Sequence, residues 1–181
     1  MCYASPTALN IIVQRKVIEA RRNMQGLLAS CEGNPLTATL CGYVFEPYAI
    51  ELLERGDTFT CRQLVNRNTK IQPIYTTLII LLSKKIVVDH VLCNQTLNQF
   101  YVPKTKNYTA IDAWIPGIGA FQMKVSKKHD IKGRTKATDD LSKPGNGNKL
   151  YWVLPPLFYY LFTMKQPYKF EQYVIRVPYP E

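Results

Sequence analysis

The sequence is poor in the residues that build zinc sites and disulfide frameworks. Its 181 residues include two histidines and five cysteines, with no Cys-x-x-Cys pair. An odd number of widely spaced cysteines argues against a disulfide framework and for a reducing compartment. Because His90 and His129 stand alone, a structural zinc ion is not expected. Any metal bound here is instead predicted to be a hard cation held by oxygen ligands.

Long hydrophobic runs are also missing. The first 22 residues lack the apolar core of a secretory signal, so no signal peptide is visible. The longest apolar run, residues 74–82, is about half of the roughly 20 residues that a membrane-spanning helix needs. We therefore expect no stable membrane insertion and interpret residues 74–82 as a buried β-strand.

Negative charge is scarce compared with positive charge. The 23 lysines and arginines exceed the 13 acidic residues and give a net charge of +10. Residues 124–149 carry half of this surplus, with eight basic side chains against three aspartates. A surplus of this size favours a polyanionic partner, which is nucleic acid more often than an anionic membrane. A solvated basic surface without a partner is the alternative.

The length suits a single domain, and the hydrophobic periodicity predicts helices followed by strands. We expect helices over residues 8–30 and 40–55, with Gly56 closing the second. Pro47 suits only the first turn of a helix, so the second helix is predicted to begin near Glu46. Strands are predicted over residues 74–82, 86–92, 99–102, 110–115, 119–125, 150–154 and 172–177.

The most informative segment is IDAWIPGIGAFQMKV, residues 111–125. Its pattern predicts a β-hairpin with a turn at Pro116 and Gly117. Side chains alternate along a strand, so Gln122 and Lys124 share one face, which Asp112 can reach from the partner strand. A carboxylate, an amide oxygen and an ammonium group would then converge on one edge of a sheet. Hydrolysis of phosphodiesters with a bound Mg²⁺ requires such a set.

These residues resemble a known family. Asp-x₉-Gln-x-Lys on a hairpin, after a helix that carries a glutamate, resembles the PD-(D/E)XK nucleases. Residues 42–64, 100–132, 151–168 and 172–180 look more narrowly like the C-terminal nuclease domain of Crinkler effectors and of retrotransposon-hot-spot proteins. The resemblance covers roughly residues 40–180. It implies an α/β fold with a restriction-endonuclease-like core, in which helices flank a central mixed sheet of four to six strands.

The resemblance also implies roles for individual residues. Asp112, Gln122 and Glu46 would bind Mg²⁺ or Mn²⁺, Lys124 would be the catalytic lysine, and Gln122 stands where an acidic residue is usual. A nucleic-acid-binding surface would contain Lys127, Lys128, His129, Lys132, Arg134 and Lys136. Residues 1–39 would form a basic helical extension and residues 40–181 the nuclease domain. The upstream modules of full-length relatives do not fit into this extension, so the chain is expected to be a nuclease-domain-only protein, the product of a truncated gene or an excised domain.

The resemblance further implies a secreted effector that is delivered to a host cell and its nucleus, where it would meet DNA and host nuclear proteins. The leading hypothesis is a Mg²⁺-dependent DNA endonuclease. The alternative is a catalytically inactive effector that binds DNA or a host partner through the same basic surface. A membrane-surface protein that binds through its first helix is a third possibility.

Each candidate residue also has an ordinary structural interpretation. Asp112 would suit a turn, Lys124 could extend from a strand into solvent, and Glu46 could stabilise a helix N-terminus. The aromatic residues of the C-terminal part could stack on nucleic-acid bases, although at their spacing such residues are more often core. These residues are Tyr151, Trp152, Tyr159 and Tyr160.

Overall fold

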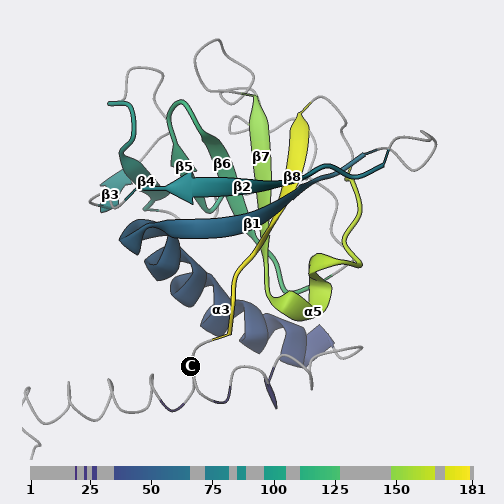
Figure 1. Cartoon of the computed structure of the whole chain (residues 1–181). Coiled ribbons are helices and arrows are strands. Elements are labelled where there is room, and N and C mark those ends of the chain that lie inside the picture. Colours follow the sequence, from purple (N-terminus) through teal and green to yellow (C-terminus); the bar gives the residue numbers. More distant parts are fainter. Residues whose placement is uncertain are drawn as a thin grey trace, which may run out of the picture.

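The chain forms one large mixed β-sheet with a long helix packed along it (Figure 1). The structure is a computed structural model, and it describes residues 19, 23, 26–27, 35–65, 72–81, 85–88, 96–104, 111–126, 148–165 and 170–179. The elements are α3 (Pro35–Arg55), β1 (Asp57–Gln63), β2 (Tyr75–Ile80), β3 (Lys85–Val88), β4 (Phe100–Pro103), β5 (Ala113–Ile115), β6 (Gly119–Met123), β7 (Lys149–Leu154), α5 (Pro156–Tyr159) and β8 (Glu171–Arg176).

The eight strands lie in the order β2-β1-β8-β7-β6-β5-β4-β3. Strands β4, β5 and β6 form an antiparallel meander, and β7 joins β6 in parallel. The predicted α/β fold with a central mixed sheet is confirmed, and the meander with its parallel neighbour is consistent with a restriction-endonuclease-like core. The sheet is larger than the four to six strands expected, because β1, β2 and β8 extend it beyond β7.

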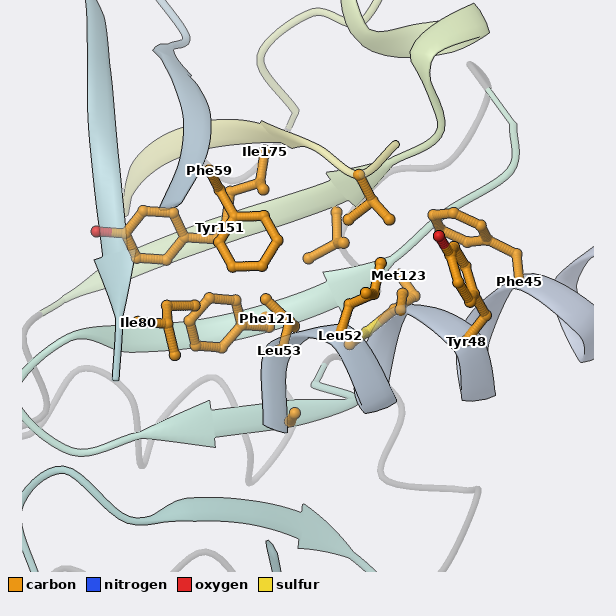
Figure 2. Packing of buried hydrophobic residues seen from close by; sticks show 14 of the residues in the cluster. Phe45, Tyr48, Leu52, Leu53, Phe59, Ile80, Phe121, Met123, Tyr151 and Ile175 are labelled. Carbon is orange, nitrogen blue, oxygen red and sulfur yellow. The ribbon is translucent and has the colours of Figure 1, made fainter. Parts of the chain in front are cut away.

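Two hydrophobic clusters cover the two faces of the sheet. The first core cluster lies between the sheet and α3, and Figure 2 shows Phe45, Leu52 and Leu53 of the helix packed over Phe121 and Met123. The second core cluster lies on the opposite face, where Trp114 and Trp152 are fully buried. Because β6 contributes Phe121 and Met123 to the first cluster and Ala120 to the second, its side chains alternate as the sequence predicted.

The helix that packs on the sheet is longer than expected. It begins at Pro35 rather than near Glu46 and ends at Arg55, and Gly56 follows with a φ of 75°. The predicted start was wrong because Pro47 lies inside the helix. Proline cannot donate a hydrogen bond to the carbonyl four residues earlier, which belongs to Tyr43. Both Pro47 and Tyr43 are on the exposed side of α3, where water can solvate this carbonyl while the opposite side packs on the sheet.

Two strands correct the sequence-based expectations. Strand β1 was missed, because the change to β-structure was placed after Arg62. Its alternation buries Phe59 and Cys61 and leaves Thr58 and Thr60 exposed. Strand β2 lies where the run 74–82 predicted a strand, but it is an exposed edge strand and not a buried one, with Ile79 62% exposed. The apolar run therefore correctly predicted a strand but wrongly predicted that the strand is buried.

One cysteine also departs from expectation. Cys41 in α3 is disulfide-bonded, whereas the spacing of the cysteines had argued for a reducing compartment or at least against a disulfide framework. Cys61 is free and buried in the first core cluster. The predicted helix over residues 8–30 lies almost entirely outside the described residues, although the Leu27 side chain packs against the first core cluster. Within the described part of the chain, no helix is long and apolar enough to cross a membrane.

A buried glutamine holds the segment after α5 against the sheet. The Gln172 side-chain oxygen accepts hydrogen bonds from Trp152 Nε1 at 3.0 Å and from the Lys165 amide at 2.9 Å, and its side-chain nitrogen donates to the Lys165 carbonyl at 2.6 Å. Gln172→Leu would leave three polar groups without these partners. We expect a loss of at least about 2 kcal/mol in the free energy of unfolding, measured by urea denaturation. An unchanged unfolding midpoint would show that these bonds contribute little.

Candidate functional site

The hairpin predicted over residues 111–125 is present as β5 and β6. Ala113 pairs with Phe121, Trp114 with Ala120 and Ile115 with Gly119. The turn closes with a hydrogen bond of 3.0 Å from the Ile118 amide to the Ile115 carbonyl. The glycines at 117 and 119 adopt positive φ values of 84° and 145°, which few other residues tolerate. The hairpin thus fixes the register of the residues on either side of it.

Asp112 lies immediately before β5 and is held there by two hydrogen bonds to β6. Its amide donates to the Phe121 carbonyl at 2.9 Å. Its carboxylate oxygen Oδ2 accepts from the Met123 amide at 2.7 Å. The carboxylate therefore stands at the end of β6, next to Lys124. The partner is a main-chain amide, so no pattern of side chains in the sequence could have identified it.

The electrostatics of Asp112 connect it with two further predicted residues. Removal from water raises the pKa of Asp112 from 3.8 to about 6, and the negative charge of Glu46 adds to this rise. The Lys124 ammonium and the Met123 amide oppose it, because both stabilise the ionised carboxylate. The structure therefore brings Glu46 of α3 and Lys124 within electrostatic range of Asp112.

Gln122 lies one residue before Met123 in β6. It is only 6% exposed, and its neighbours Phe121 and Met123 belong to the first core cluster, so alternation places Gln122 on the opposite face. Its side-chain oxygen Oε1 is buried and has no hydrogen-bond partner. A buried acceptor without a donor costs about 1–3 kcal/mol. This oxygen is consequently a predicted ligand atom that is buried without a hydrogen-bond donor.

These residues offer few metal ligands. Among the described residues, no group of three or more histidine, cysteine, aspartate or glutamate side chains could hold a metal ion. The carboxylates of Asp112 and Glu46 lie within electrostatic range of each other, whereas the Gln122 side chain is on the face of the sheet opposite the one that α3 covers. All three groups offer the oxygen ligands that Mg²⁺ prefers, and Mg²⁺ usually keeps several water ligands. The donor set therefore suits a partly hydrated Mg²⁺ or Mn²⁺ ion and not a closed protein cage.

The predicted nucleic-acid-binding surface lies outside the described residues. This applies to Lys127, Lys128, His129, Lys132, Arg134 and Lys136. Of the aromatic residues considered for base stacking, Tyr151, Trp152 and Tyr159 are buried in the core clusters, whereas Tyr160 is 66% exposed. Only Tyr160 of these four therefore presents its ring to solvent.

Fold and site together define an α/β protein with a large mixed sheet, consistent with a restriction-endonuclease-like core, and a cluster of acidic and basic side chains after its central hairpin. No protein-family model matches the sequence, and no solved structure matches it. Two curated proteins of Phytophthora infestans, Crinkler effector protein 16 and Crinkler effector protein 15, are each 50% identical to it over 182 aligned residues.

The alignments include 99% of this chain and 29% of each of these relatives. The chain thus spans less than a third of the length of the curated relatives that it matches. Nearly the whole chain is thus similar to a part of these two Crinkler effector proteins, which agrees with the resemblance seen in the sequence.

Proposed function

We propose that this chain is a metal-dependent nuclease that hydrolyses phosphodiester bonds of DNA. The observation that carries the proposal is the arrangement after the β5–β6 hairpin. There Asp112 is fixed by the Met123 amide, with Lys124 and Glu46 in electrostatic range, and Gln122 of the same strand as Met123 has a buried oxygen without a hydrogen-bond partner. The net charge of +10 favours a polyanionic substrate.

In this proposal, Asp112, Gln122 and Glu46 hold Mg²⁺ or Mn²⁺. The bound ion would supply Lewis-acid stabilisation of the phosphate and would orient water. Lys124 places its ammonium beside the carboxylates, where it can stabilise negative charge that develops on the phosphate. Asp112 keeps its orientation through the bond from the Met123 amide, so the ligand set needs little reorganisation before it binds an ion.

The biological setting proposed here rests on the relatives. Both are named effectors, and we infer that the chain acts inside a foreign host cell, with nuclear DNA as its target. Host nuclear proteins are further proposed partners. Since the chain spans 29% of these relatives, the activity of the whole proteins is part of the proposal.

A second candidate function is binding without catalysis. Gln122 is neutral where the nuclease pattern usually has an acidic residue, which lowers the negative charge available for a metal ion. A binding protein would show salt-dependent affinity for DNA that neither Mg²⁺ nor Lys124→Ala changes. A nuclease would require both the ion and the lysine for cleavage.

Cleavage of supercoiled plasmid DNA tests the leading proposal. The unmodified chain should convert the plasmid to open-circular or linear forms with Mg²⁺ and not with EDTA. Asp112→Ala should lower the rate at least about 100-fold. Asp57→Ala is a matched control, because Asp57 is an exposed aspartate at the start of β1. Equal cleavage by Asp112→Ala and the unmodified chain, or no cleavage by either, would exclude hydrolysis at this site.

A further inference from the structure

The face of β1 and β2 that lies opposite α3 carries exposed aromatic and hydroxyl groups. Arg62 of β1 pairs directly with Tyr75 of β2, and the next pair on this face is Thr60 with Thr77. The two threonines are exposed, and Tyr75 is 59% exposed. This end of the sheet therefore presents side chains to solvent, whereas the second core cluster covers the same face at β7.

Tyr160 completes the patch from α5. Its ring meets that of Tyr159 edge-on, with 4.9 Å between the ring centroids. Tyr159 in turn lies against Arg62, whose guanidinium carbon is 5.5 Å from the centre of the Tyr159 ring. The buried Arg62–Tyr159 contact is thus bordered by two exposed tyrosines, since Tyr75 pairs with Arg62 and the Tyr160 ring contacts that of Tyr159.

Arg62 is a buried cation that no acidic side chain of the described residues pairs with. It is 8% exposed, and its Nη2 donates to the carbonyls of Tyr159 at 2.6 Å and Phe162 at 3.0 Å. Its Nε has no hydrogen-bond partner, and neither does the hydroxyl of Tyr159. No carboxylate of the described residues forms an ion pair with this guanidinium. Because surrounding protein screens charge weakly, a charge that no described carboxylate neutralises can act on an anionic ligand at the nearby surface.

We propose that Tyr75 and Tyr160 form a stacking platform for bases of single-stranded nucleic acid, with Arg62 attracting the phosphate backbone and the threonines supplying hydroxyl groups. Exposed aromatic rings beside positive charge are the combination that binds single strands without sequence preference. The proposal extends the proposed function, since it takes nucleic acid as the ligand, but it does not depend on cleavage. The platform is built from β1, β2 and α5, whereas the site at Asp112 is built from α3 and the β5–β6 hairpin.

Fluorescence anisotropy with a labelled 20-nucleotide oligothymidine, measured in EDTA, tests the platform without cleavage. Tyr75→Ala and Tyr160→Ala should each weaken binding at least about fivefold, the lower end expected for loss of one stacked base. Tyr75→Phe and Tyr160→Phe retain the ring and should bind within about twofold of the unmodified chain. Tyr43→Ala removes an equally exposed tyrosine from α3 and should leave the affinity unchanged.

The platform would be overturned if the unmodified chain did not bind, if both alanine variants bound as tightly as the unmodified chain, or if the phenylalanine variants lost as much affinity as the alanine variants. Ile79 is exposed on the same face as Tyr75 but cannot stack on a base. Ile79→Ala should therefore leave oligonucleotide binding unchanged, whereas it would weaken the docking of a protein on this face. A loss of oligonucleotide binding in Ile79→Ala, with no loss in the tyrosine-to-alanine variants, would also contradict the proposal. Plasmid cleavage by the tyrosine variants is a separate readout, so the platform and the proposed hydrolysis can fail independently.

Discussion

Asp112→Asn is expected to abolish Mg²⁺-dependent cleavage and at the same time to stabilise the protein in the absence of metal. Asparagine has nearly the same shape as aspartate, and its oxygen can still accept the hydrogen bond from the Met123 amide. It removes the charge that would bind the ion, so cleavage should fall at least about 100-fold. A loss of activity without a loss of stability would separate the role of this carboxylate from general unfolding, which makes the variant informative.

The stability gain follows from the pKa of Asp112. Burial raises this pKa from 3.8 in the unfolded chain to about 6 in the folded protein, so the folded state binds the proton more tightly. This contribution to stability is complete below about pH 4 and is lost as the pH rises from about 4 to about 6. Each pKa unit corresponds to about 1.4 kcal/mol, and we expect Asp112→Asn to gain about 1–3 kcal/mol at pH 7.5.

Urea denaturation at pH 4 and at pH 7.5, with and without Mg²⁺, measures this gain. At pH 7.5 in EDTA, the free energy of unfolding of Asp112→Asn should exceed that of the unmodified chain. Near pH 4 the two free energies should be the same. Added Mg²⁺ should stabilise only the unmodified chain, because binding to the folded state shifts the unfolding equilibrium. A variant less stable than the unmodified chain at pH 7.5 in EDTA would contradict the burial of a charged carboxylate at this position.

Gly119→Ala is expected to have the largest effect on stability. Gly119 begins β6 with a φ of 145°. A Cβ atom there would lie 2.7 Å from the Lys149 carbonyl oxygen and 3.0 Å from Tyr151 Cε2. Because the carbonyl belongs to the neighbouring strand β7, relief of this clash requires a shift of the backbone. We expect a cost of about 3 kcal/mol or more and a melting temperature lower by about 6 to 12 °C.

Gly117→Ala is the matched control in the same turn. Gly117 has a φ of 84°, but a Cβ atom there would meet only the Leu97 side chain, at 3.5 Å. This substitution should cost about 1–2 kcal/mol, from the backbone conformation alone. Thermal unfolding followed by circular dichroism compares the two variants. Equal melting temperatures for both would show that the contact between β6 and β7 tolerates a side chain at residue 119.

The sequence predicted most elements of the fold but not their environment. Local alternation was sufficient to place β6, β7 and β8, and Gly56 correctly closed α3. The exposure of β2 could not be predicted, because an apolar run does not show whether a strand lies at the edge or in the centre of a sheet. Pro47 misled the prediction of the start of α3, since tertiary packing on the opposite side of the helix outweighs the lost hydrogen bond.

The candidate site was predictable to the extent that it depends on local register. The hairpin spacing placed Asp112 opposite the end of β6, and the structure confirms that hairpin. The approach of Glu46 depends on how α3 crosses the sheet, so only the resemblance to a family suggested it. Arg62 and Tyr75 were not predicted, because their pairing joins a strand that was missed to one expected to be buried. The roles of Asp112, Gln122, Glu46 and Lys124 in catalysis stay predictions.

The central claim is that a divalent cation binds beside the β5–β6 hairpin, and crystals soaked in Mn²⁺ test it most directly through anomalous scattering. We predict one strong anomalous peak at about 2.0–2.3 Å from a carboxylate oxygen of Asp112 and from Oε1 of Gln122. The peak should be missing from Asp112→Ala crystals soaked in the same way. Ordered density for both side chains with no peak between them, or a peak that persists in Asp112→Ala, would contradict the claim.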